Sequence, residues 1–228
     1  MENSAALELL PDDVLKEIYL LEEQAKRLDM RDRAQQEFMA YVHHVYDNFI
    51  EGTHHRIIAE KLERIASGEL KRLIVNMPPR HSKSEFASYL MPSWFLGRNP
   101  KLKIIQATMN TELAVRFGRK VRDLIADPKY KEVFPDTDLK PDSQAAGRWE
   151  TAAGGEYFAA GVGAAMTGRG ADLLIIDDPH SEQDALSSTA YDNAYEWYTS
   201  GPRQRLQPGG SIIIVQTRWS KKDITGRL

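Results

Sequence analysis

The sequence predicts an α/β fold in which a mainly parallel sheet is flanked by helices. Short apolar runs, rich in β-branched residues, alternate with segments of helical periodicity, and several of the runs are apolar without any polar alternation. Such runs are typical of strands that are covered on both faces, and the alternation of strand and helix favours parallel pairing. The predicted strands lie at residues 73–75, 103–107, 157–160, 173–176 and 211–215, with helices at about 83–96, 111–126 and 181–200.

The composition agrees with a globular protein and excludes several classes of site. The 228 residues are 42% hydrophobic and 28% charged, with a net charge of −3, so the chain as a whole does not indicate nucleic-acid binding, although a local basic patch would suffice. The absence of cysteine excludes disulfides, zinc–thiolate sites and cysteine nucleophiles. No apolar run approaches the roughly 18 residues of a membrane span, and the acidic start, MENSAALELLPDD, does not resemble a signal peptide.

The first part of the chain is predicted to be helical and polar. Leu15, Ile18, Leu21 and Ala25 recur at helical spacing, and a second amphipathic stretch covers 31–49. A third helix is expected at 54–66, closed by Ser67-Gly68. We therefore divide the chain into an N-terminal helical segment, 1–52, acting as a lid or subdomain, and a core, 53–228.

The first strand runs into the stretch NMPPRHSKSE, residues 76–85. It has the lysine and hydroxyl of the phosphate-loop pattern G-x-x-x-x-G-K-[ST], but Met77 and Ser82 stand where the glycines belong. The chemistry needs backbone amides around an anion at a helix N-terminus, a lysine that reaches the outer phosphates and a hydroxyl for magnesium. Ser82 would have a steric cost if its φ were positive. A polar turn that caps a helix is the alternative for this segment.

Two further strands end in polar residues. LLIIDDP, 173–179, has the form of a Walker B strand, in which Asp177 would hold magnesium and Asp178 would polarise the attacking water. Two adjacent buried acids are costly without a cation, although they could instead cap the next helix. IIIVQTRW, 212–219, ends in groups able to sense a γ-phosphate, or is an ordinary strand end. All three segments together, each after a strand and in this order, predict a P-loop NTPase of the ASCE or RecA-like kind.

These motifs resemble those of the large terminase subunit of tailed bacteriophages, the ATPase that packages DNA into capsids. RLIVNMPPRHSKSE resembles the family's PPRHGKSE form with Ser82 in place of glycine, TGRGADLLIIDDPH resembles its Walker B segment, and SIIIVQTRW resembles its coupling motif. The resemblance covers roughly residues 50–228. It implies ATP and Mg²⁺ as cofactors, and an ATPase half whose nuclease domain is absent from this chain.

The resemblance also implies roles for individual residues. Lys83 would contact the β- and γ-phosphates, Ser84 and Asp177 would hold magnesium, and Gln216 with Thr217 would form the coupling motif. Asp178 falls where a catalytic glutamate usually lies, with Glu182 as a second candidate for the general base. The other residues expected around the nucleotide are Pro79, Arg80, His81, Ser82 and Glu85 in the loop and His55 near the adenine.

An arginine near the transferred phosphoryl group accelerates such reactions by roughly 10³ to 10⁵. Arg119 is our first candidate, and Arg80, Arg116 and Arg169 are others; each has a surface arginine as its alternative. The small-residue stretch VGAAMTGRGAD, 162–172, suits a flexible loop against DNA or a neighbouring subunit, or is simply a long turn.

The resemblance further implies double-stranded DNA, a portal protein and a small terminase subunit as partners. It implies a homo-oligomeric ring, a pentamer, that works in the cytoplasm of the bacterial host cell without contacting a membrane. Two alternatives stay open: a helicase-like DNA-remodelling ATPase, and a non-catalytic nucleotide-binding assembly module, which the missing glycines and Asp178 favour. A metal-dependent hydrolase built on Asp177, Asp178 and His180 is a third, and it leaves Lys83 and Ser84 unexplained.

Overall fold

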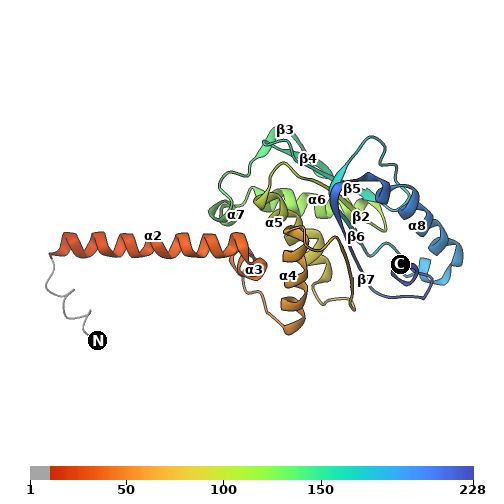
Figure 1. Cartoon of the computed structure of the whole chain (residues 1–228), viewed down its shortest axis with the longest axis horizontal. Coiled ribbons are helices and arrows are strands. Elements are labelled where there is room, and N and C mark those ends of the chain that lie inside the picture. Colours follow the sequence, from red (N-terminus) through yellow and green to blue (C-terminus); the bar gives the residue numbers. More distant parts are fainter. Residues whose placement is uncertain (1–10) are drawn as a thin grey trace.

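A computed structural model describes residues 11–228 and contains one seven-stranded sheet (Figure 1). Its strand order is β1-β7-β6-β2-β5-β4-β3. The first five of these are mutually parallel, and β4 and β3 are antiparallel additions at one edge. The strands are β1 (Arg72–Asn76), β2 (Lys103–Thr108), β3 (Leu139–Ala145), β4 (Arg148–Thr151), β5 (Glu156–Gly161), β6 (Ala171–Asp177) and β7 (Leu206–Gln216). The predicted mainly parallel α/β sheet is confirmed.

Helices cover both faces of the sheet. Figure 1 shows α4, α5 and α6 on one side and α8 on the other. The helices are α2 (Asp12–Gln36), α3 (Phe38–Val45), α4 (Thr53–Ala66), α5 (Met91–Arg98), α6 (Thr111–Ile125), α7 (Pro128–Val133), α8 (Ser188–Ser200) and α9 (Ile224–Arg227). A π-helix, η1 (Glu85–Leu90), precedes α5, and two 3₁₀ turns, η2 (Asp184–Leu186) and η3 (Pro202–Arg205), flank α8.

The unbroken apolar strands are buried from both sides, and β6 shows why. Leu173 and Ile175 belong to the hydrophobic cluster under α4, α5 and α6, whereas Leu174 and Ile176 belong to the cluster under α8. Successive side chains of a strand point to opposite faces, so a strand between two helical layers needs apolar residues at every position.

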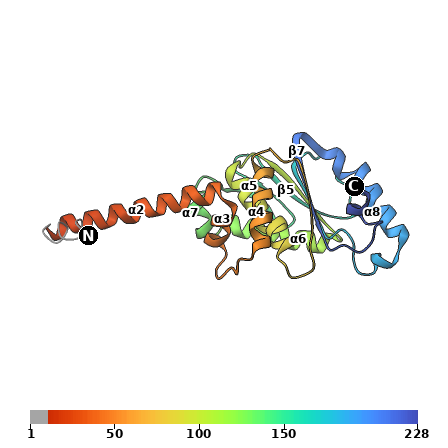
Figure 2. The same cartoon turned by 60° about the horizontal axis from the view of Figure 1, so that its bottom comes forward.

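The N-terminal helical region is split at Glu37. Here the backbone is extended (φ −105°, ψ 117°), and the freed amide of Phe38 donates to Glu63 Oε1 at 2.7 Å. Phe38, Tyr41 and Val42 are fully buried in the same cluster as the sheet, while the first part of α2 extends away from the body (Figures 1 and 2). Within residues 11–228, no helix is long and apolar enough to cross a membrane.

Two local features differ from the expected pattern. The helix expected from residue 181 begins at Ser188, because Ser181 and Asp184 bond each other in a turn and Ser187 caps α8 by accepting from Ala190 N. The β3–β4 hairpin carries no long apolar run and was not among the expected strands; Trp149 is the only fully buried large side chain of β4.

Candidate functional site

Three polar segments emerge at the same edge of the sheet. β7 lies between β1 and β6 and runs parallel to both, with Asn76 opposite Gln216 and Asp177 opposite Val215. The carboxyl ends of these strands therefore deliver the 77–84 loop, the Asp177-Asp178 pair and Gln216-Thr217 to one place. This edge is where α/β sheets bind ligands.

The loop after β1 is bent by two residues in the left-handed region. Arg80 has φ +63° and Ser82 has φ +62°, a conformation that costs a non-glycine residue about 1–2 kcal/mol. Ser82 therefore adopts the strained φ that a glycine would take without cost. A helical segment begins directly after it, at Lys83, and His81 Nδ1 donates to the Pro79 carbonyl at 2.8 Å within the turn.

Lys83 is buried and paired with the second acid. Its Nζ lies 2.7 Å from Asp178 Oδ2, and the side chains are 7% and 30% exposed. Asp178 has φ +39°, and its other oxygen, Oδ1, accepts from Thr217 N at 2.7 Å. One carboxylate thus connects the end of β6 to the lysine after β1 and to the backbone after β7.

Asp177 is 2% exposed and is bound by two hydroxyls. Ser84 Oγ donates to Oδ1 at 2.9 Å and Ser88 Oγ donates to Oδ2 at 2.6 Å. Gln106 Nε2 continues the chain by donating to Ser88 Oγ at 2.9 Å. Burial, with a smaller contribution from Asp178, raises the pKa of Asp177 to about 6 despite the two serine hydrogen bonds that lower it.

Ser88 and Gln106 are members of this cluster that the sequence motifs do not identify. Ser88 lies in η1, four residues after Ser84, and both side chains reach the same carboxylate. The π-helix ends at Leu90, and Met91 N donates to Phe86 O, five residues back. The next residue, Pro92, has no N–H and so cannot donate the α-helical bond to the carbonyl four residues before it. The serine pair at this spacing and the helix-interior proline were visible in the sequence.

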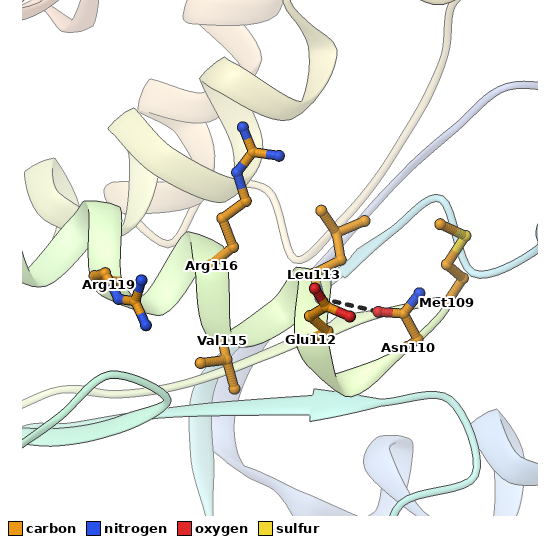
Figure 3. Close-up of a pocket in the computed structure, with 7 residues that line it drawn as sticks. All are labelled: Met109, Asn110, Glu112, Leu113, Val115, Arg116 and Arg119. Carbon is orange, nitrogen blue, oxygen red and sulfur yellow. Dashed lines mark hydrogen bonds between the residues drawn. The ribbon is translucent and has the colours of Figure 1, made fainter.

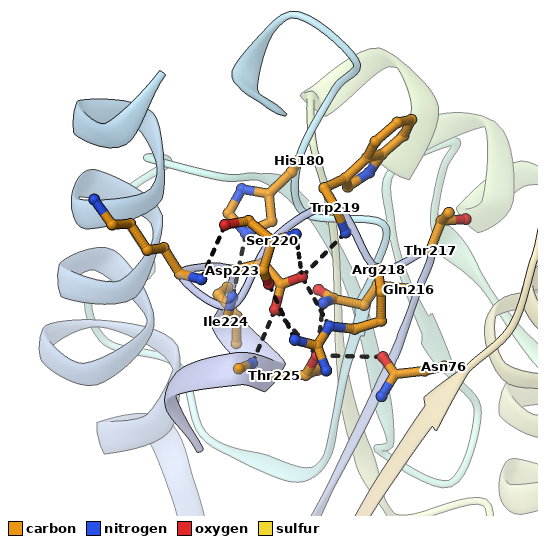
Figure 4. Close-up of polar contacts among 12 residues, drawn as sticks. Asn76, His180, Gln216, Thr217, Arg218, Trp219, Ser220, Asp223, Ile224 and Thr225 are labelled. Carbon is orange, nitrogen blue, oxygen red and sulfur yellow. Dashed lines mark hydrogen bonds and ion pairs between the residues drawn. The ribbon is translucent and has the colours of Figure 1, made fainter. Parts of the chain in front are cut away.

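The end of β7 leads into a second polar network (Figure 4). Gln216, 1% exposed, donates through Nε2 to Thr225 Oγ1 at 2.7 Å, and Thr217 Oγ1 lies 3.4 Å from the Met77 carbonyl. The fully buried Asp223 accepts from Arg218 Nε at 2.9 Å and from Gly226 N at 2.8 Å. Hydrogen bonds lower the pKa of Asp223 against the opposing effect of its burial.

His55 lies beside the 77–84 loop but outside the cluster around Asp177 and Asp178. It is 5% exposed, its Nδ1 accepts from Gly52 N at 2.9 Å, and its ring stacks on Phe86 at 5.1 Å. His54 is 3.8 Å from His55 and 5.9 Å from His81, centroid to centroid. Burial, followed by the charge of His54, lowers the pKa of His55, so the ring is neutral near pH 7.

Within residues 11–228, no hydrogen bond or ion pair joins an arginine candidate to Lys83 or Asp178. Arg119 and Arg116 are exposed on α6 and line a pocket with Asn110 (Figure 3). Arg169 forms an ion pair with Glu156 and its guanidinium lies 3.9 Å from the Phe158 ring centroid, so the 162–172 loop is anchored there. Arg80 is exposed in the loop itself.

The remaining carboxylate candidates are also outside the cluster. Glu182 is exposed, and no hydrogen bond or ion pair links it to another residue in the described part of the chain. Glu85 bonds Lys120 Nζ at 2.9 Å. His180 accepts from Ile224 N at 3.4 Å and faces Tyr191, and residues 11–228 contain no group of three or more His, Cys, Asp or Glu side chains placed to hold one metal ion. His180 is therefore bonded to the start of α9 rather than to Asp177 or Asp178.

Comparisons with known proteins find similar solved structures, among them a phage large terminase. No family model matches the chain, and no curated protein matches it. The crystal structure of the large terminase of bacteriophage HK97 is similar with a TM-score of 0.47 and 13% identity, over 78% of this chain and 36% of that one. The chain therefore spans about a third of the length of that terminase.

Proposed function

We propose that this chain is an ATP-hydrolysing motor domain of a phage large terminase subunit. The observation that carries the proposal is the convergence of four residues at one sheet edge, where Lys83 pairs with Asp178 and Ser84 donates to Asp177. A capping role alone would not require a buried lysine, or a buried acid next to a second acid. That the ATPase would be a motor, and would come from a phage, is inferred from the motif resemblance of residues 50–228.

The residues present fit a magnesium-bound nucleotide. Mg²⁺ prefers carboxylate, hydroxyl and water oxygens, and Ser84 Oγ and Asp177 offer the first two side by side. A cation there would offset the cost of ionising the buried Asp177. When bound, Mg²⁺ would neutralise charge on the phosphate oxygens. In this proposal the backbone amides of the αL turns at Arg80 and Ser82, and of the helix that begins at Lys83, would bind the phosphates.

In this proposal the chain acts mainly by positioning and by charge. When ATP binds, Lys83 leaves Asp178 and contacts the β- and γ-phosphate oxygens instead. Asp178, released from the lysine but still held by Thr217 N, accepts a hydrogen bond from the water that attacks in line. Since Thr217 also contacts the loop after β1, movement of Asp178 is transmitted to the end of β7 and the 218–226 network.

The remaining features of the proposal rest on the resemblance. Double-stranded DNA would be gripped through its phosphates, so binding should weaken as salt increases. A small terminase subunit and a portal protein would be partners, in a homo-oligomeric ring within the host cytoplasm. A non-catalytic nucleotide-binding module remains the second candidate, because Lys83 and Asp178 neutralise each other in this structure.

Calorimetry with Mg-ATP tests the nucleotide site. We expect the parent chain to bind, and Lys83→Ala to lose more than about tenfold in affinity, since charge-assisted hydrogen bonds are worth roughly 1.5–3 kcal/mol. Lys140→Ala is the matched control, because it removes a lysine paired with Glu150 on the β3–β4 hairpin. Absence of binding by the parent, or equal losses in both variants, would contradict a phosphate site at Lys83.

A further inference from the structure

Helix α2 projects from the body (Figures 1 and 2), and its projecting part carries an apolar stripe. Its members recur at alternating intervals of four and three residues, the spacing of a coiled-coil seam: Val14, Ile18, Leu21, Ala25 and Leu28. Leu21 is 58% exposed and Leu28 is 50% exposed. At about 1.5 Å per residue the stripe is about 21 Å long, and Asp32 ends it at the next seam position.

The stripe faces away from the protein body. α2 packs against the body through Met30 and Ala34, and the Ala34 carbonyl accepts from Trp94 Nε1 at 2.9 Å. Each of these residues follows a stripe residue, Leu21 or Ala25, by nine positions. At about 100° per residue, nine positions correspond to half a rotation around the helix. The stripe therefore lies on the side of α2 opposite to the side that packs on the body, where a second helix can reach it.

The charges of α2 are divided between its halves. Residues 12–23 hold five acids and one lysine, a net charge of −4. Residues 24–36 hold four basic residues and two acids, a net charge of +2. Two copies in antiparallel orientation bring each acidic half against a basic half, whereas parallel copies bring like halves together.

The charged residues that flank the stripe also favour the antiparallel orientation. Glu17 and Arg31 lie two heptads apart on one side of it, so in an antiparallel pair with Leu21 opposite the partner's Ala25, each Glu17 faces the partner's Arg31. Within the chain, Arg31 forms only a long ion pair, in which its Nε lies 3.6 Å from Oδ1 of the adjacent Asp32. In a parallel pair, each Glu17 would lie near the partner's Glu22, which gives two repulsive contacts. In the antiparallel pair the two Glu22 side chains face each other, which gives one repulsive contact.

We propose that two copies of this chain associate through α2, as an antiparallel pair along the Val14–Leu28 stripe. The contact is isologous, so it joins two chains and no more. It does not depend on the nucleotide site. A seam of four facing layers is short, so the association is weak and concentration-dependent.

Sedimentation equilibrium over a wide concentration range tests the surface. We expect a reversible monomer–dimer equilibrium for the full chain, which Leu21→Glu shifts to monomer. Leu20→Glu is the matched control, because Leu20 is a leucine of the same helix with 60% exposure, but it lies outside the stripe. Far-UV circular dichroism should show equal helix content for both variants. A parent that stays monomeric, or equal effects of the two substitutions, would overturn the proposal.

Two further variants test the orientation. Glu17→Arg and Arg31→Glu should each weaken the dimer, and the double variant should restore it, because the opposed charges are then exchanged. Since the chain has no cysteine, a mixture of Leu21→Cys and Ala25→Cys chains should form a mixed disulfide under oxidation. Disulfides that form instead within the Leu21→Cys sample alone would indicate a parallel pair and contradict the proposal.

Discussion

Asp177 has an unusual electrostatic position for an acid. It is nearly fully buried, and its pKa is raised from 3.8 to about 6, mainly by burial and further by Asp178. A raised pKa means that the folded chain holds the proton more tightly than the unfolded chain. Stability therefore falls as pH rises from about 4 to about 6, and above that window ionised Asp177 costs on the order of 3 kcal/mol.

Replacing Asp177 by asparagine should remove this pH dependence. We expect Asp177→Asn to unfold with a free energy up to about 3 kcal/mol higher than the parent above pH 6, and the difference to disappear below pH 4. Denaturant unfolding at several pH values measures it, with the exposed Asp136→Asn as the control. A parent that is more stable than Asp177→Asn at pH 7 would show that the ionised carboxylate is not a cost.

Sequence patterns could predict the residues of the site that follow strands, because a strand's end fixes where the next side chains lie. Lys83, Ser84, Asp177 and Asp178 do meet, as the order of the motifs implied. Ser88 and Gln106 could not be selected in this way, since their roles depend on the helix rotation and on the neighbouring strand. Arg119 and Glu182 were expected at the site from their positions in the sequence, but both side chains are exposed at the surface.

At the scale of the element, the loop after β1 stores backbone strain at Ser82. We expect Ser82→Gly to be neutral or slightly stabilising, because relief of the positive φ is offset by the entropy of glycine. Ser82→Val should be destabilised by roughly 1–2 kcal/mol relative to Ser82→Gly, since a β-branched residue tolerates this φ poorly. Thermal unfolding of the two variants measures the difference. Equal stability would mean that the αL turn is not formed in solution.

Element type follows the hydrophobic period closely, whereas element ends depend on single residues. The parallel strands and α6 were predictable from their apolar patterns. The break at Glu37, the π-helix before Pro92 and the turn between Ser181 and Ser187 each depend on a local hydrogen bond or a missing N–H. The bond from Phe38 N to Glu63 also needs a tertiary partner in place, which the sequence around Glu37 does not reveal.

At the scale of the whole molecule, the parallel sheet brings distant segments of the chain to one edge. The loop at 77–84, the acids at 177–178 and the strand end at 216–217 meet because β7 inserts between β1 and β6. The N-terminal region is divided between two tasks: α3 completes the core beneath the sheet, and α2 projects from it. The proposed ATPase site and the proposed α2 surface are thus carried by separate parts of the fold.

Phosphate release from Mg-ATP is the most direct test of the central claim. It should be followed at high protein concentration for the parent, Lys83→Ala and Asp178→Asn. We predict turnover by the parent and its loss in both variants, with ATP binding lost in Lys83→Ala and kept in Asp178→Asn. Parent turnover that persists in Lys83→Ala, or a parent that binds ATP without releasing phosphate, would contradict an ATPase site built on Lys83 and Asp178.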